Sequence, residues 1–195
     1  MTKICLMLIM LVFLFRGLAE CSVLFEANNA CLPKDASESI SRGIVPEGLS
    51  ALRVTASIKT HKPGIHSVSD IHGTPDYKIL LNIDGEVLKL SGQLHEENSE
   101  PKKLSDPETG DGIRYVFQEN LRLKAGHHSI VVTLQNDDIE VHKTMTLEAG
   151  SMNNLVLEPI YRAVPGKKRL GLYGTPSFTE GLKGFALLLN GRTLD

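Results

Sequence analysis

Apolar and polar residues alternate along most of the chain after about residue 50. The alternation is clearest at Leu52–Ile58, Ile79–Ile83 and Ile130–Leu134, and it continues through Ile139–Leu147 and Leu155–Leu157. A two-residue period is typical of strands with one buried face. Gly, Pro, Asn and Asp separate the runs at short intervals, and no segment after the first twenty residues has a helical period over ten or more residues. The pattern predicts an all-β fold, an antiparallel β-sandwich.

Two of the separating pairs predict tight hairpins. Asp84-Gly85 lies between Ile79–Ile83 and Val87–Leu90, and Asp-Gly tolerates the positive φ angles that a two-residue hairpin requires. Asn190-Gly191 follows the apolar run Phe185–Leu189 in the same way, but too few residues remain for a full return strand. We therefore expect the final strand to dock on the sandwich or to pair with another chain.

The N-terminus predicts export. Residues 1–19 combine Lys3 with an unbroken apolar run at Ile4–Phe15, which is shorter than the roughly 20 residues of a membrane-spanning helix. One reading has a signal peptidase cut before Glu20 and release a soluble chain. The alternative is a lipoprotein cut before Cys21, with that cysteine lipidated and the protein held at the outer membrane, although Glu20 departs from the small residue usual there.

The leader and the domain boundaries follow from composition. Residues 20–50 are rich in Asn, Ser, Gly and Pro and predict an irregular linker. Cys21 and Cys31 are the two cysteines that remain after cleavage, and in an oxidising compartment they predict a disulfide unless Cys21 is lipidated. We assign residues 51–162 to the sandwich and residues 163–195 to a C-terminal extension that carries the final strand.

Composition and motifs argue against several function classes. The formal net charge is −2 and no basic patch dominates, which disfavours nucleic acid as a partner. The chain has no Trp, which weighs against an aromatic platform for sugars. It also has no Gly-x-Ser-x-Gly elbow, no phosphate loop ending in Gly-Lys-Ser/Thr and no Cys-x-x-Cys-His haem motif. We therefore expect a protein that is not an enzyme and needs no cofactor.

The histidines are the strongest candidates for chemistry. His61, His66 and His72 fall within twelve residues, with Asp70 among them, and imidazole and carboxylate groups suit zinc or copper. The spacing matches no standard metal motif, and the surrounding Pro and Gly residues favour a solvated loop instead. The adjacent pair His127-His128 precedes a strand, so its side chains should face opposite ways.

Two charged segments have weaker functional interpretations. The acidic segment at residues 95–112 predicts a mobile surface loop, and the alternative is a calcium site at Asp106, Glu108 and Asp111. The cluster at residues 167–169 could meet an anionic lipid or polymer, but such a run is more often a solvated connection.

The segment Leu121–Pro159 carries a family resemblance. Its order of strand, turn and Leu-x-x-Gly elements resembles the PEGA-type and related immunoglobulin-like sandwich modules of bacterial surface proteins, and "ILLNIDGE" and "GFALLLNGRTL" look like the opening strand and turn of such modules. The resemblance implies an immunoglobulin-like sandwich and a non-catalytic envelope protein. We expect a periplasmic or cell-surface module that binds or scaffolds another envelope component. The alternatives are a carbohydrate- or peptidoglycan-binding module, or a metal-dependent hydrolase that uses His61, His66 and His72.

Overall fold

The computed structural model describes residues 45–195, apart from 65–68, 101–105, 164–167, 170–171 and 174. The predicted signal peptide, most of the leader, Cys21, Cys31 and His66 lie outside the described residues. The predictions made for them, including the disulfide, therefore stay predictions.

The described chain is built from strands, which confirms the all-β prediction. Two single 3-10 turns, η2 (Gln135–Asp137) and η3 (Phe178–Glu180), are its helical elements. Within the described residues no helix has the length and apolar character needed to cross a membrane. The strands are β1 (Leu49–Thr60), β2 (Lys78–Ile83), β3 (Glu86–Ser91), β4 (Gln93–Ser99), β5 (Gly110–Lys124), β6 (Gly126–Leu134), β7 (Ile139–Leu147), β8 (Met152–Tyr161), β9 (Lys168–Arg169), β10 (Leu172–Tyr173), β11 (Leu182–Leu189) and β12 (Arg192–Thr193).

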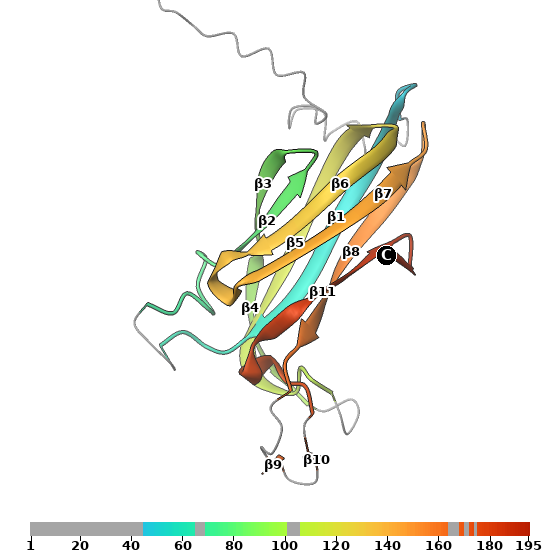
Figure 1. The fold of residues 1–195 in the computed structure, drawn as a ribbon. Helices are drawn as coiled ribbons and strands as arrows, with labels where there is room; N and C mark the ends of the chain where they lie inside the picture. Colours follow the sequence, from blue (N-terminus) through green and yellow to red (C-terminus); the bar gives the residue numbers. More distant parts are fainter. Residues whose placement is uncertain (1–44, 65–68, 101–105, 164–167, 170–171, 174) are drawn as a thin grey trace, which may run out of the picture.

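Two sheets make up the body of the molecule (Figure 1). One has the order β12-β11-β8-β1-β5-β4, the other has the order β3-β2-β6-β7, and β9 pairs with β10 separately. All pairs are antiparallel except β1 with β8, which run parallel. The expectation of a purely antiparallel arrangement is wrong at this pair. The reason lies in the connection, because the chain crosses from β7 in one sheet to β8 in the other and does not return through a hairpin.

The two sheets share one hydrophobic core. The alternating positions of the sequence supply most of it, and Ile58, Ile79, Leu81, Ile130 and Leu157 are fully buried. The opposite positions of the same strands are half-buried or exposed, except Ala51 and Lys59 near the two ends of β1, which are also buried. The hydrophobic pattern therefore identified the inward faces correctly.

The two predicted turns are confirmed. Asp84 and Gly85 have φ angles of 53° and 95° and join β2 to β3. Asn190 and Gly191 have φ angles of 51° and 79° and join β11 to β12. Positive φ at both central residues is the conformation for which Asp-Gly and Asn-Gly are favoured.

The two ends of the acidic segment belong to strands, so the expectation of a surface loop over residues 95–112 is wrong at residues 95–99 and 110–112, whereas residues 101–105 lie outside the described residues. Gln93–Ser99 pairs antiparallel with β5, in a register that places Leu94 opposite Tyr115 and Ser99 opposite Gly110. β4 is an edge strand, where charged residues are tolerated because one face and one edge meet solvent. Its polar composition therefore does not prevent it from pairing.

The C-terminal segment completes the larger sheet. β11 pairs antiparallel with β8 from Leu182 opposite Tyr161 to Leu189 opposite Leu155, and its Leu182, Phe185 and Leu187 are buried in the common core. β12 covers only the end of β11, through two residue pairs.

β1 begins at Leu49, two residues before the start assigned to the sandwich.

Candidate functional site

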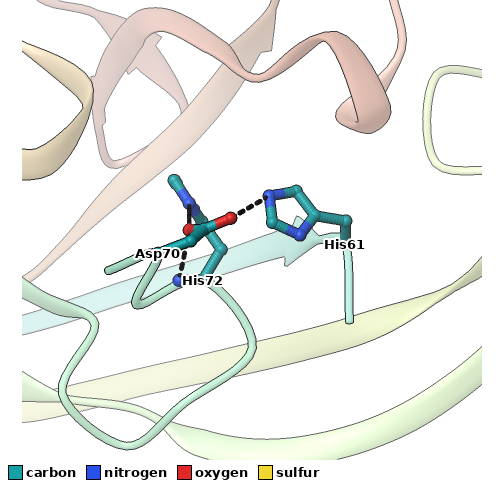
Figure 2. A group of neighbouring side chains, drawn as sticks. All are labelled: His61, Asp70 and His72. Atoms are coloured by element: carbon teal, nitrogen blue, oxygen red, sulfur yellow. Dashed lines mark hydrogen bonds and ion pairs between the residues drawn. The ribbon is translucent and has the colours of Figure 1, made fainter. Parts of the chain in front are cut away.

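The loop between β1 and β2 brings together three of the four candidate ligands. His61 follows the last residue of β1, and Asp70 and His72 lie on the described part of the loop before β2 (Figure 2). Nε2 of His61 lies 3.3 Å from Oδ2 of Asp70. Nδ1 of His72 lies 2.5 Å from Oδ1 of the same carboxylate. Asp70 is therefore held between two imidazole rings, whose centroids are 4.9 Å apart.

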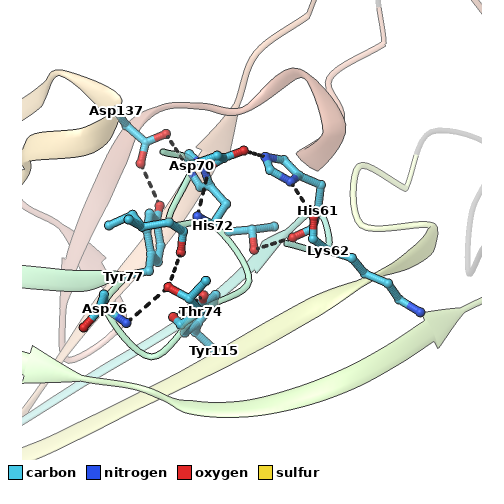
Figure 3. Close-up of polar contacts among 11 residues, drawn as sticks. His61, Lys62, Asp70, His72, Thr74, Asp76, Tyr77, Tyr115 and Asp137 are labelled. Atoms are coloured by element: carbon cyan, nitrogen blue, oxygen red, sulfur yellow. Dashed lines mark hydrogen bonds and ion pairs between the residues drawn. The ribbon is translucent and has the colours of Figure 1, made fainter. Parts of the chain in front are cut away.

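A second carboxylate reaches the cluster from the opposite sheet. Asp137 belongs to η2, the turn between β6 and β7, and its Oδ1 lies 3.2 Å from Nε2 of His72 (Figure 3). Its Oδ2 accepts a hydrogen bond of 2.8 Å from the hydroxyl of Tyr77, a buried residue just before β2. The His72 ring is thus placed between two carboxylates, and Asp137 joins the loop to the rest of the molecule.

Aromatic and hydroxyl groups hold the loop in this conformation. Tyr77 contacts the His72 ring on one side and the Tyr115 ring on the other, with centroid distances of 4.9 and 5.0 Å. Tyr115 donates through its hydroxyl to the carbonyl of Thr74. Gly73 has a φ of 76°, and a Cβ there would lie 2.6 Å from Cδ of Pro63, so this turn of the loop needs glycine.

The hydrogen bonds within the cluster favour the charged forms of His72 and Asp70. The hydrogen bond with Asp137 raises the pKa of His72, and it outweighs burial, which acts in the opposite direction. Burial by itself raises the pKa of Asp70. The hydrogen bonds from the backbone and ring of His72, with the nearby charges of both rings, reverse that effect and lower it overall.

A pocket of about 360 Å³ opens beside these groups. His61, Asp70 and His72 line its polar side, and Phe178 and Leu182 provide apolar surface from η3 and the start of β11. The side chains of the three polar residues are between 11% and 20% exposed, so they are largely shielded from solvent.

A buried lysine, Lys59, also lines the pocket. Lys59 is 1% exposed, and its Nζ donates to the carbonyls of Glu108 and Gly110 and to Oγ of Ser99. Burial lowers the pKa of Lys59, against the attraction of nearby carboxylates. Because its ammonium group binds the β4–β5 hairpin through three hydrogen bonds and lies over the Phe178 ring, we assign this residue to the framework of the pocket.

The remaining predicted residues are placed elsewhere. His128 is buried and binds Asp84 and the carbonyl of Lys124, whereas His127 is exposed and contacts Thr146, which confirms their opposite orientations.

The candidate calcium ligands have other partners. Glu108 binds Arg114 and the hydroxyl of Tyr161, and Asp111 binds Lys62. Lys168 and Arg169 form β9.

Sequence reasoning missed two members of the site, Asp137 and Tyr77. Asp137 belongs to the turn sequence Asn136-Asp137-Asp138, 65 residues after His72, and the sequence pattern predicts only a turn there. Tyr77 is a single aromatic residue at the end of a loop. The sequence pattern does not identify them, because Asp137 is brought beside the loop by the pairing of β2 with β6, and Tyr77 is a lone aromatic residue whose contact with Asp137 depends on that pairing.

Comparisons with known proteins add no assignment. Neither the models of protein families, nor the curated proteins, nor the solved structures include a match to this chain. The functional interpretation therefore rests on the sequence pattern and on the geometry of the site.

Proposed function

We propose that this chain is an exported, non-catalytic module of the bacterial envelope that binds another envelope component at the pocket beside η3. The observation that carries this proposal is the pocket itself, which combines an apolar side with a small set of convergent polar groups. Ligand sites commonly have this composition. The apolar N-terminal run supports export, and the resemblance of Leu121–Pro159 to PEGA-type modules supports an immunoglobulin-like sandwich of the envelope.

The position of the pocket suits a binding module. It is lined by connections and strand ends, namely the β1–β2 loop, η2 and η3, on a framework of two sheets with one core. Binding residues are often found on loops that a rigid sheet framework positions. In the proposed arrangement the sheets supply stability and the loop end supplies recognition.

Site-specific photo-crosslinking in the native bacterium tests the proposal. A photoreactive amino acid replaces Thr179, an exposed residue at the pocket rim. The matched control replaces Val87, which is 58% exposed on β3 of the other sheet. We expect a discrete adduct with an envelope component at position 179 and none at position 87. Equal labelling at both positions, or a chain retained in the cytoplasm on fractionation, would contradict the proposal.

A further inference from the structure

We propose that His61, Asp70 and His72 bind a zinc ion, through Nε2 of His61, the Asp70 carboxylate and Nδ1 of His72. This inference goes beyond the proposed function, because it does not depend on which envelope component occupies the pocket. The ligand atoms of these three residues all lie within 4.8 Å of one another. Two imidazole nitrogens and one carboxylate oxygen form a ligand set that zinc accepts.

The distances require little rearrangement. Bonds of about 2.0 to 2.1 Å in a tetrahedral site place neighbouring ligand atoms about 3.3 Å apart. Nε2 of His61 already lies at this distance from Oδ2 of Asp70. Nδ1 of His72 lies 2.5 Å from the other oxygen, Oδ1, so the carboxylate would turn one oxygen toward the ion as the His72 ring withdraws by under about 1 Å.

The outer hydrogen bonds orient both rings toward the proposed ion. Nδ1 of His61 lies 3.0 Å from the carbonyl of Lys62, and Nε2 of His72 lies 3.2 Å from Asp137. Both partners are acceptors, so in a metal-bound state these nitrogens carry the ring protons and the two nitrogens that face Asp70 direct their lone pairs at the ion. Metal-binding histidines usually have this second-sphere arrangement, with the other nitrogen on a carbonyl or a carboxylate.

The site leaves a coordination position open. Among the described residues, three protein ligands fill three of the four positions of a tetrahedral zinc ion, and all three line the pocket from which a fourth ligand would enter. A water molecule or a group of the bound partner would fill it.

The wild-type chain tests the proposal directly. The purified mature protein is stripped with a chelator, dialysed against zinc and then against metal-free buffer, and its metal content is measured by mass spectrometry. We expect one zinc ion per chain, and we expect cobalt in its place to give a visible spectrum with nitrogen ligation. A wild-type protein that is folded by circular dichroism and retains no zinc would overturn the proposal, whatever the variants do.

Variants then assign the ion to the site. His61→Ala and His72→Ala should each weaken zinc binding by more than about 100-fold, and Asp137→Asn should keep one ion per chain with affinity about tenfold lower. His142→Ala is the matched control, because His142 pairs with Glu140 on the exposed face of β7 without a third ligand. Zinc retained at full affinity in the His61→Ala/His72→Ala double variant, or lost in His142→Ala, would overturn the assignment.

Discussion

At the scale of single residues, Asp137 is the group that couples the β1–β2 loop to the second sheet. One oxygen faces Nε2 of His72, and the other accepts from the hydroxyl of Tyr77. The Tyr77 side chain is 1% exposed, so removal of Asp137 leaves a buried hydroxyl without this acceptor. The role of Asp137 in stability can therefore be measured separately from metal binding.

We expect Asp137→Ala to lower the free energy of unfolding of the metal-free protein by about 2 kcal/mol, since a buried hydroxyl is left without its acceptor. Urea denaturation measures the change. Asp138→Asn is the control in the same turn, because Asp138 is exposed with a φ of 54° and Asn tolerates that conformation. Equal losses in the two variants would show that the turn, and not the contact with Tyr77, is responsible.

A second residue-scale prediction concerns Glu97. Hydrogen bonds from Arg114 and Ser99 lower the pKa of Glu97 from 4.5 to about 2. Because the folded-state pKa is depressed, the stabilisation is present above pH 4.5 and is lost as the pH falls toward 2. The Glu97 side chain is 35% exposed, so solvent screening limits the effect to about 1 kcal/mol.

The test compares the wild type with Glu97→Gln by chemical denaturation between pH 2 and pH 7. We expect the wild type to be more stable at neutral pH and the difference to shrink below pH 4.5. A difference that stays constant over the whole range would mean that the charge of Glu97 does not contribute.

At the scale of elements, the β4–β5 hairpin depends on a buried charge. Lys59 lies at the end of β1, and its ammonium group binds two carbonyls next to the start of β5 and the last side chain of β4. It also lies 5.0 Å from the centroid of the Phe178 ring. The polar residues at the end of this hairpin thus surround a cation, which gives the acidic segment a structural role.

We expect Lys59→Met to destabilise the hairpin by about 2 kcal/mol, because the carbonyls of Glu108 and Gly110 lose their donor in a buried place. Hydrogen exchange measured by mass spectrometry should show faster exchange in peptides from β4 and the start of β5. Lys89→Met on the exposed face of β3 is the control and should change stability by less than about 0.5 kcal/mol. Unchanged exchange in β4 would refute the structural role of Lys59.

At the scale of the whole molecule, the C-terminal strand belongs to the core. β11 pairs with β8 and buries three apolar side chains, Leu182, Phe185 and Leu187. Each contributes roughly 1.5 to 3 kcal/mol on burial, and their sum approaches the total stability of about 5 to 15 kcal/mol usual for a domain. We expect truncation after Gly181 to abolish cooperative folding, as measured by thermal denaturation. Removal of Asp195 alone is the control, and a truncated chain that keeps its melting temperature would contradict the prediction.

The sequence by itself determined the features that depend on neighbouring residues. The two-residue period identified strands and inward faces at Leu52–Ile58, Ile79–Ile83 and Ile130–Leu134, and the pairs Asp84-Gly85 and Asn190-Gly191 marked two hairpins. These properties are local, because side-chain alternation and positive φ angles are set within a few residues. The same logic placed His127 and His128 on opposite faces of β6.

The tertiary structure alone decided which distant residues meet. β1 pairs in parallel with β8, about a hundred residues later in the chain. β4 forms a strand because it pairs with β5 and because the ammonium group of Lys59 binds Ser99 at its end. The candidate site shows the same division. The sequence identified His61, Asp70 and His72 as potential ligands, but the pairing of β2 with β6 brings Asp137 to His72, and no local pattern encodes a contact over such a separation.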